Sequence, residues 1–409
     1  MEAMKRILKF AAALMMAAAC TPSAKDSPFG WATCTSLEGG HYEITGGAGK
    51  KGEAATIITL KSNGKDMRDV IVAALKSYDI VILDGSDGIF PISTTMHLDS
   101  LRNKTIVGVN GAHLRSIEQM TPEILEYIEA NKDKYMNDAP DGRGKFHMPF
   151  KSSFNNANRT AYAYRRALYD YTGDREEKLC HSGMFSFNNG CENIIMRNLA
   201  FEGTGVFRSL ADNMIRITTR SNHIWIDHCS FTDPSRCCLS YASGADFVTV
   251  SRCIFCYTER SGKHTLGILI SSSDHQPDDV GHLNMTIANC YLENVWARQP
   301  MGRYGHVHVL NNYHNCVGGT GINPRTESTF LIEGNYFEDG SRAFCRYHID
   351  INVPAAYQWK DNRFGTDDPI EDKGEVTMPY AYSPLPSGVM KEDVLSDVGP
   401  VLSDPLRIR

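Results

Sequence analysis

Seven stretches of eight residues share one pattern of apolar and polar positions. Their first and third residues are apolar around a variable residue, as in a half-buried β-strand, and two mostly polar residues then lead to a second short strand. Each stretch therefore predicts a strand, a bend and a strand. The stretches are IIMRNLAF (194–201), IWIDHCSF (224–231), VTVSRCIF (248–255), MTIANCYL (285–292), VHVLNNYH (307–314), FLIEGNYF (330–337) and YQWKDNRF (357–364).

The sixth and eighth positions carry similar side chains from one stretch to the next. Stacked coils in a fixed register place equivalent positions above one another, so asparagines can form a ladder and rings can stack in the core. The pattern predicts an all-β protein, a right-handed parallel β-helix. Unpaired cysteine behaves as a small buried apolar residue, so we expect the cysteines of the column to fill the core rather than form disulfides. The sixth column reads Leu199, Cys229, Cys253, Cys290, Asn312, Asn335, Asn362, and the eighth reads Phe201, Phe231, Phe255, Leu292, His314, Phe337, Phe364.

The remaining chain divides around these coils. Strand-like segments precede them, and a helical pattern at 67–75 predicts a cap. A helical insertion interrupts the coils, with one helix opening at Thr121 and another near 160–171, and we expect it to pack outside the solenoid or to overhang a substrate groove. The expected divisions are a lipoprotein-type signal peptide (1–19), an N-terminal cap with the first coils (20–114), the helical insertion (115–189), the β-helix core that carries the active site (190–365) and a tail packed on the β-helix (366–409).

The N-terminus has the features of an export signal. Lys5 and Arg6 precede a largely apolar run that ends in small residues directly before Cys20, which predicts lipid attachment at that cysteine. The alternative is ordinary cleavage, with Cys20 incidental. We expect an exported protein, either a cell-surface or periplasmic lipoprotein that meets the membrane only through Cys20, or a secreted protein.

Composition limits the partners. The formal net charge of −6 gives no global attraction to a polyanion, so an acidic substrate must be held by a local cluster, and no nucleic acid is expected. The chain has 12 cysteines, and removing Cys20 leaves an odd number, so at least one thiol lacks an intramolecular partner.

Two strings resemble those of a known family. WIDH spans 225–228 and RQPMGRYGHVHVLNNY spans 298–313. They resemble family 1 polysaccharide lyases, the pectate and pectin lyases, whose hallmark R-x-P-x-x-R-x-G-x-x-H-V-x-N-N is filled here at every fixed position. The similarity covers roughly residues 29–402 apart from the insertion. It implies a lyase that cleaves homogalacturonan, the pectin backbone, by β-elimination.

The resemblance also implies catalytic roles. Elimination on a uronide removes the proton at C5, next to the carboxyl carbon, and expels the O4 substituent, so it needs a base and cations near the carboxyl group. Arg298 matches the base of the family, and Arg303 matches a second arginine that supports the substrate carboxylate or orients the site. An arginine acts as a base only after losing a proton, which favours an alkaline optimum. The alternative for both arginines is surface salt bridging.

Three further residues are expected to bind substrate: Asp227, Lys263 and Arg325. Asp227 matches an aspartate that the family keeps beside the cleft, where it orients an arginine or contacts a cation. Alternatively, Asp227 and His228 only satisfy the bend between two strands. Lys263 lies near the place of a substrate-binding lysine of the family, although the alignment needs a short insertion.

The chain departs from the family at the calcium site. Pectate lyases carry two acidic ligands, typically as D-G-x-x-D, at positions that correspond here to Arg236 and Ser240. Neither residue suits a hard cation that prefers several carboxylates. Pectin lyases, which are calcium-independent, place an arginine at the position of Arg236, so we expect its guanidinium to replace the ion as a third catalytic arginine; the alternative is pairing with Asp233. No cofactor is expected at the usual calcium site, although Asp212 is a weak candidate ligand and Ca²⁺ stays possible.

Several functions stay open. The main expectation is a monomeric lyase acting on pectate or pectin. One alternative is a calcium-independent pectin lyase specific for methyl-esterified pectin, and another, from a different class, is a non-catalytic β-helix that binds pectin at the cell surface. A glycoside hydrolase would need a group of carboxylates in neighbouring coils, and the repeats supply none.

Overall fold

The computed structural model describes residues 27–48, 54–117, 183–205, 213–261, 265–345, 354–366 and 370–407, and a few positions between 123 and 134. The expected signal peptide, Cys20 and the second helix of the insertion lie outside the described residues. Several described positions between 123 and 134 are helical, where the first helix of the insertion is expected. Within the described ranges, no helix has both the length and the apolar character needed to span a bilayer.

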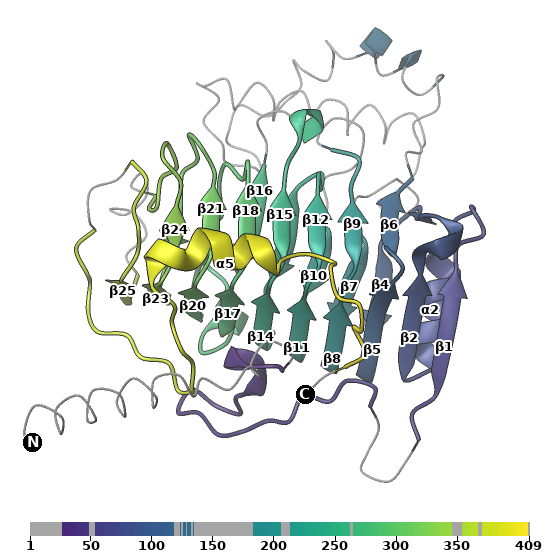
Figure 1. The fold of residues 1–409 in the computed structure, drawn as a ribbon, viewed down its shortest axis with the longest axis horizontal. Coiled ribbons are helices and arrows are strands. Elements are labelled where there is room, and N and C mark those ends of the chain that lie inside the picture. The colour runs from purple at the N-terminus through teal and green to yellow at the C-terminus, as the bar shows by residue number, and fades with distance from the viewer. Residues whose placement is uncertain are drawn as a thin grey trace, which may run out of the picture.

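The described strands form three sheets in which all neighbours run parallel, and the chain visits the sheets in turn, as in a parallel β-helix (Figure 1). The ten-stranded sheet contains β1 (Ile57–Lys61), β2 (Ile80–Asp84), β5 (Arg102–Val109), β8 (Glu192–Arg197), β11 (Asn222–Asp227), β14 (Asp246–Ser251), β17 (Met285–Ala288), β20 (His306–Leu310), β23 (Thr329–Glu333) and β25 (Ala356–Lys360). The eight-stranded sheet contains β3 (Phe90–Ile92), β6 (His113–Ser116), β9 (Ala200–Glu202), β12 (Ser230–Thr232), β15 (Ile254–Cys256), β18 (Tyr291–Glu293), β21 (Tyr313–Asn315) and β24 (Tyr336–Phe337). The seven-stranded sheet contains β4 (Met96–Asp99), β7 (Phe185–Asn188), β10 (Ile215–Ile217), β13 (Cys237–Tyr241), β16 (Leu266–Ile270), β19 (Met301–Gly302) and β22 (Asn323–Pro324).

The strand register confirms the alignment of the seven repeats. Ile224 pairs with Ile194 on one side and with Val248 on the other, and the first position of every later repeat continues the same row to Tyr357. The fifth position of each repeat has a positive φ, which turns the chain between the two sheets and favours asparagine or glycine. These residues are Asn198, His228, Arg252, Asn289, Asn311, Gly334 and Asp361.

The column at the sixth position forms the predicted ladder. The backbone N–H of Cys290 donates to Asn312 Oδ1 at 2.9 Å, and that of Asn312 donates to Asn335 Oδ1 at 2.9 Å. The backbone N–H of Cys229 donates to Cys253 Sγ, and that of Cys253 donates to Cys290 Sγ, which continues the ladder. The cysteines of the column are buried free thiols. Each of these buried N–H groups forms a hydrogen bond with the next coil, so the ladder holds adjacent coils in register without a covalent bond.

The eighth position stacks rings inside the solenoid. Phe201 and Phe231 have centroids 5.2 Å apart, and Phe231 and Phe255 have centroids 5.3 Å apart, with nearly parallel planes. His314 and Phe337 repeat the arrangement at 4.4 Å. These buried rings belong to one core that runs along the solenoid.

Segments outside the coils cover the solenoid (Figure 1). Helix α2 (Arg68–Ser77) caps the N-terminal end, as the helical pattern predicted, and buries Ile71 and Leu75 in the core. The 3₁₀ helix η2 (Gly30–Thr33) lies on the outer face of the ten-stranded sheet, where Trp31 is buried. Helix α5 (Met390–Ser396), in the C-terminal segment, packs Met390 and Val394 against a row of tyrosines in strands of the eight-stranded sheet.

Candidate functional site

Four arginines lie at the ends of strands of the seven-stranded sheet. Arg236 directly precedes β13, Arg298 lies three residues before β19, Arg303 directly follows β19, and Arg325 directly follows β22. Because β19 and β22 are neighbours and only β16 separates β19 from β13, the solenoid brings side chains from distant parts of the sequence to one sheet.

Arg298 rests on an apolar floor. Arg298 is half-buried and its backbone φ is 63°. Its Nη1 donates a hydrogen bond to Cys237 Sγ at 2.8 Å. Cys237 is fully buried in a cluster with Leu266 and Leu269, to which Ala297 and Met301 add half-buried side chains. The left-handed backbone at a non-glycine residue is a strained conformation of the kind that is often kept for function.

Asp274 ties two of the arginines together. Arg303 Nε donates to Asp274 Oδ1 at 2.6 Å, and Arg325 Nη2 donates to Oδ2 at 3.1 Å. Thr326 Oγ1 also donates to Oδ1, at 2.8 Å. Partial burial opposes the charge of Asp274, but the hydrogen bonds from Arg303 and Thr326 outweigh it and lower the pKa of the carboxyl. Asp274 therefore stays ionised and holds both guanidinium groups in place.

Arg325 is partly buried and lies near other positively charged side chains. Burial and the nearby charges of Arg303 and Arg298 lower its pKa from the ordinary value, against the opposing effect of Asp274. Its Nε is buried without a hydrogen-bond partner among the described residues. Its guanidinium is partly exposed, and this charge is suited to an incoming carboxylate.

Arg236 does not pair with Asp233, the ion pair that would have given it a structural role. Asp233 accepts hydrogen bonds from Thr258 and Ser261 instead, and no ion pair joins it to Arg236 among the described residues. The carbonyl of Arg236 accepts from Tyr257 Oη at 3.0 Å, which anchors its backbone while its side chain stays half-buried. Arg236 is thus left as a cation beside β13.

The residues at the expected calcium position do not fit a calcium ion. The side chain of Arg236 offers no acceptor atom, and Ser240 pairs in the strand register with Arg216, an exposed cation on β10. Asp212 lies outside the described residues. Among the described residues, no three His, Cys, Asp or Glu side chains lie together in a way that would hold a metal ion.

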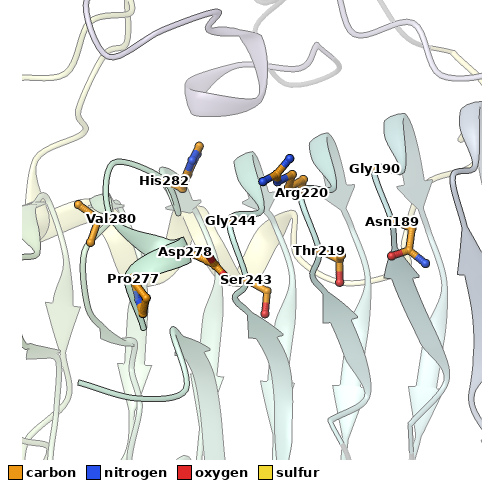
Figure 2. A pocket seen from close by; sticks show the side chains of 10 residues that line it. All are labelled: Asn189, Gly190, Thr219, Arg220, Ser243, Gly244, Pro277, Asp278, Val280 and His282. Atoms are coloured by element: carbon orange, nitrogen blue, oxygen red, sulfur yellow. The ribbon is translucent and has the colours of Figure 1, made fainter. Parts of the chain in front are cut away.

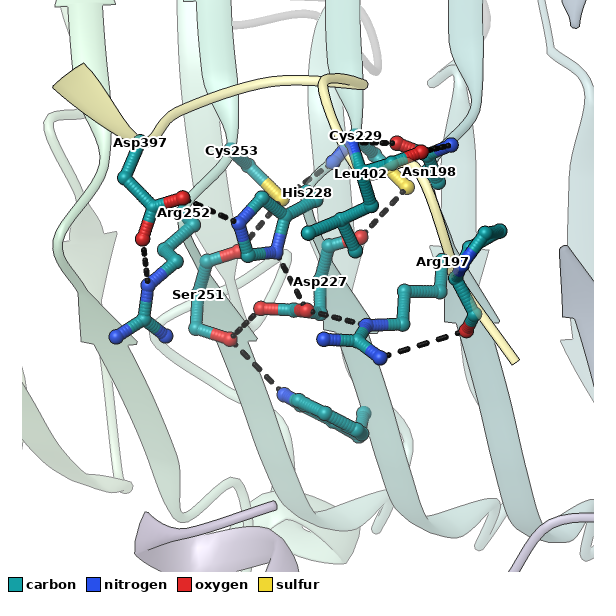
Figure 3. Close-up of polar contacts among 12 residues, drawn as sticks. Arg197, Asn198, Asp227, His228, Cys229, Ser251, Arg252, Cys253, Asp397 and Leu402 are labelled. Atoms are coloured by element: carbon teal, nitrogen blue, oxygen red, sulfur yellow. Dashed lines mark hydrogen bonds and ion pairs between the residues drawn. The ribbon is translucent and has the colours of Figure 1, made fainter. Parts of the chain in front are cut away.

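Asp227 is not part of this group, and its expected contact with substrate needs correction. The side chain is completely buried on the ten-stranded sheet, where it accepts from Arg197 Nε at 2.8 Å and Ser251 Oγ at 2.6 Å and bonds to His228 Nδ1 at 2.6 Å (Figure 3). Arg197 Nη1 in turn donates to the carbonyl of Arg407 at 2.7 Å. The C-terminal segment covers Asp227, which has a structural role.

A hollow lies at the edge of the seven-stranded sheet where β7, β10 and β13 end, the edge opposite Arg236 (Figure 2). It is lined by turns that follow β7, β10 and β13, including Arg220, and by the loop before β17, including His282. A hydrogen bond from His282 to Asp246 raises the pKa of the imidazole. The length of β13 separates this hollow from Arg236, and none of the four arginines lines it.

The structure and the expectations from the sequence agree only in part. Arg303 and Arg325 both donate hydrogen bonds to Asp274. Arg298 donates to Cys237, the residue that directly follows Arg236. Lys263 lies outside the described residues. Asp274 and Cys237 were not among the residues predicted from the sequence. The signal for Asp274 is its place at the start of the loop after an apolar strand, and Cys237 directly follows Arg236.

Comparison with protein families gives a match to the pectate lyase model over residues 178–383. Pectate lyase A of Aspergillus niger is 36% identical over 222 residues, which is 52% of this chain and 64% of the relative. Pectate lyase B of Colletotrichum gloeosporioides is 30% identical over 227 residues, 54% of this chain and 66% of the relative. The match thus spans slightly less than two thirds of the length of these relatives.

Solved structures show the same fold. A pectate lyase from Bacillus sp. N165 in complex with trigalacturonate superimposes with a TM-score of 0.56 at 16% identity, covering 91% of this chain and 98% of that one. Pectate lyase II from Xanthomonas campestris gives a TM-score of 0.54 at 16% identity, with the same coverage. The right-handed parallel β-helix expected from the repeats is confirmed.

Proposed function

Because the chain belongs to the pectate lyase family, we propose that it is a polysaccharide lyase that cleaves homogalacturonan by β-elimination, with Arg298 as the base. The match to residues 178–383 includes Arg298, Arg303, Arg325 and Arg236. The substrate follows from the pectate lyases it resembles, one of which was solved with trigalacturonate.

The observation that carries the proposal is the Asp274 cluster, defined as Asp274, Arg303 and Arg325, with Arg298 near enough for its charge to act on Arg325. Arg298 takes the proton from C5, the electron pair left on that carbon forms the new double bond to C4, and the O4 substituent leaves with the bonding electrons. Negative charge spreads onto the substrate carboxylate during this step. The guanidinium groups of the Asp274 cluster stabilise that charge without reorganising.

A further part of the proposal concerns the metal. The pair Arg236 and Ser240 does not fit calcium, so we assign to Arg236 the positive charge that a bound ion would supply. No step of this mechanism passes through a metal. A guanidinium at this place binds a free carboxylate and loses that partner when the carboxylate is methylated. This favours de-esterified pectate, and pectin lyase activity on methyl-esterified pectin is the second candidate because Arg236 stands where a calcium ligand would be.

Calcium dependence tests this assignment. With polygalacturonate, we expect a chelator to leave at least about half of the activity, and Arg236→Ala to lower kcat/KM roughly 10- to 100-fold, because a hydrogen bond to a charged group contributes about 1.5–3 kcal/mol. Arg102→Ala is the matched control, since Arg102 lies on the ten-stranded sheet in an exposed ion pair with Glu192. The rate is measured as ultraviolet absorbance of the unsaturated product, on polygalacturonate and on methylated pectin. Loss of all activity with chelator, restored by calcium, would overturn the assignment of Arg236.

Activity should rise toward alkaline pH. A general base reacts only without its proton, so we expect kcat/KM to increase toward alkaline pH. The measurement is a pH profile of kcat/KM on polygalacturonate, with unfolding followed at each pH to exclude loss of structure. Full activity on a plateau down to about pH 5 would argue against Arg298 as the base.

The variant Asp274→Asn tests whether the negative charge of Asp274, rather than the shape of its side chain, orients the arginines of the Asp274 cluster. The amide keeps the shape of the carboxylate but removes the charge that orients Arg303 and Arg325, so we expect kcat/KM to fall roughly 10- to 100-fold. Asp278→Asn, in the adjacent loop, is the control because Asp278 has no bond to either arginine. Equal kinetics of the two variants would remove Asp274 from the site.

Location and anchoring complete the proposal. The run before Cys20 supports export, with a lipid on Cys20 as the anchor and secretion as the alternative. We also propose that the protein acts as a monomer. A palmitate label that follows the wild type but not Cys20→Ala into the membrane fraction tests the anchor; equal labelling of both would exclude it.

A further inference from the structure

Trp296 is an exposed aromatic residue at the rim of the candidate site. It lies in the loop between β18 and β19, two residues before Arg298, and 43% of its surface is exposed. The chain has four tryptophans, of which Trp31 and Trp225 are buried and Trp359 is half-buried. Burial accounts for the presence of the other three tryptophans but not for that of Trp296.

The backbone of Trp296 is held on both sides. Its N–H donates to the carbonyl of Thr265 at 3.0 Å and to Thr265 Oγ1 at 2.8 Å, and its carbonyl accepts from the N–H of Thr320 at 2.6 Å. A Cβ at Gly318 would lie 3.4 Å from the indole ring, so the ring borders the next loop at a residue without a side chain. A surface that is already ordered loses little conformational entropy when it binds a ligand.

Trp296 is also linked to the catalytic arginine. Two residues of extended chain place its Cα within about 7 Å of that of Arg298. Ala297, between them, packs in the cluster around Cys237, and the Arg298 guanidinium donates to Cys237. The loop thus presents an indole and a guanidinium from one anchored segment.

We propose that Trp296 is a stacking platform for the pyranose ring of a galacturonate unit adjacent to the unit whose C5 proton Arg298 removes. A galacturonate ring exposes carbon-bound hydrogens on one face, opposite its axial oxygen, and its carboxylate lies at the edge of the ring. The indole covers the apolar face, while the arginines bind the carboxylates. This inference rests on the proposed function, because it takes its ligand from that reaction.

Fluorescence of the full chain tests binding without turnover. In the Arg298→Gln background, we expect trigalacturonate to shift the tryptophan emission and to reduce quenching by acrylamide, because the sugar covers the exposed indole. Adding Trp296→Phe should abolish both changes, whereas adding Trp359→Phe, the control in β25 at the C-terminal end of the solenoid, should preserve them. Absence of trigalacturonate binding, or changes that survive Trp296→Phe, would overturn the proposal.

Kinetics with Arg298 intact give a second readout. We expect Trp296→Ala to raise KM for polygalacturonate roughly tenfold with a smaller change in kcat, and Trp296→Phe to restore part of the loss, since a phenyl ring still stacks. An unchanged KM in Trp296→Ala, with product forming normally, would refute the platform and leave the lyase standing. Trigalacturonate binding through Trp296 without any unsaturated product would refute the lyase and leave the platform standing.

Discussion

Replacing Arg298 with glutamine lowers kcat on polygalacturonate by roughly 10²- to 10⁴-fold, the usual contribution of a general base. Glutamine keeps a planar amide that is too short to replace the contact of Arg298 Nη1 with Cys237 Sγ, and this amide cannot take a proton from C5. The Asp274 cluster is untouched, so we expect substrate binding to weaken much less than catalysis. The measurement is kcat and KM from the absorbance of the unsaturated product.

Arg102→Gln is the control for the charge that this substitution removes. Arg102 is largely exposed on another sheet, so its loss should leave kcat within about twofold. Urea unfolding of both variants shows that the solenoid is intact. A kcat for Arg298→Gln close to that of the wild type would exclude Arg298 as the base.

Asp227→Asn has the largest expected effect on stability. The variant leaves the Arg197 guanidinium buried without its anion, which costs about 3–5 kcal/mol of unfolding free energy for a broken buried ion pair. Asp87→Asn is the control, because the pair of Asp87 with Lys61 is exposed and should contribute at most about 1 kcal/mol. Urea denaturation measures both. A loss for Asp227→Asn no larger than that of the control would contradict the role of Asp227 in fixing the C-terminal segment.

The effect of Asp227→Asn depends on pH. Burial opposes the charge of Asp227, but the hydrogen bond and charge of His228 and the charge of Arg197 outweigh it and lower its pKa. That stabilisation is present above the unfolded pKa of about 3.9 and is lost as the pH falls through the folded value. Burial also opposes protonation of His228, but hydrogen bonds to Asp227 and Asp397 raise its pKa. Its contribution is complete below about pH 6.5 and fades as the pH rises through the raised value, so the difference between variants is largest between about pH 4 and pH 6.5.

The register of the solenoid could be predicted because each coil repeats the same alternation at the same distance from its bend. A shift of one residue would turn Ile224 and Ile226 outward, so the apolar pattern allows one alignment. The asparagine column follows from the same register. The tail at 366–409 was expected to pack on the β-helix, but the surfaces that η2 and α5 cover could not be predicted, because nothing local to either segment specifies them.

Candidate site residues could be named where a string or a counted spacing marks them, and Asp274 was missed because neither marks it. Arg298 and Arg303 stand in a fixed frame, whereas Asp274 reaches them only because β16 and β19 are neighbours. Asp227 was misplaced for the converse reason. Its burial comes from Arg407 and the C-terminal segment, which lie far along the chain and carry no pattern that marks the contact.

The central claim is that this chain breaks homogalacturonan by elimination rather than hydrolysis. The most direct measurement follows ultraviolet absorbance and reducing ends together during digestion of polygalacturonate. Elimination predicts one unsaturated, absorbing end for every new reducing end, and predicts that Arg298→Gln reduces both in proportion. Reducing ends that accumulate without absorbance would contradict the account.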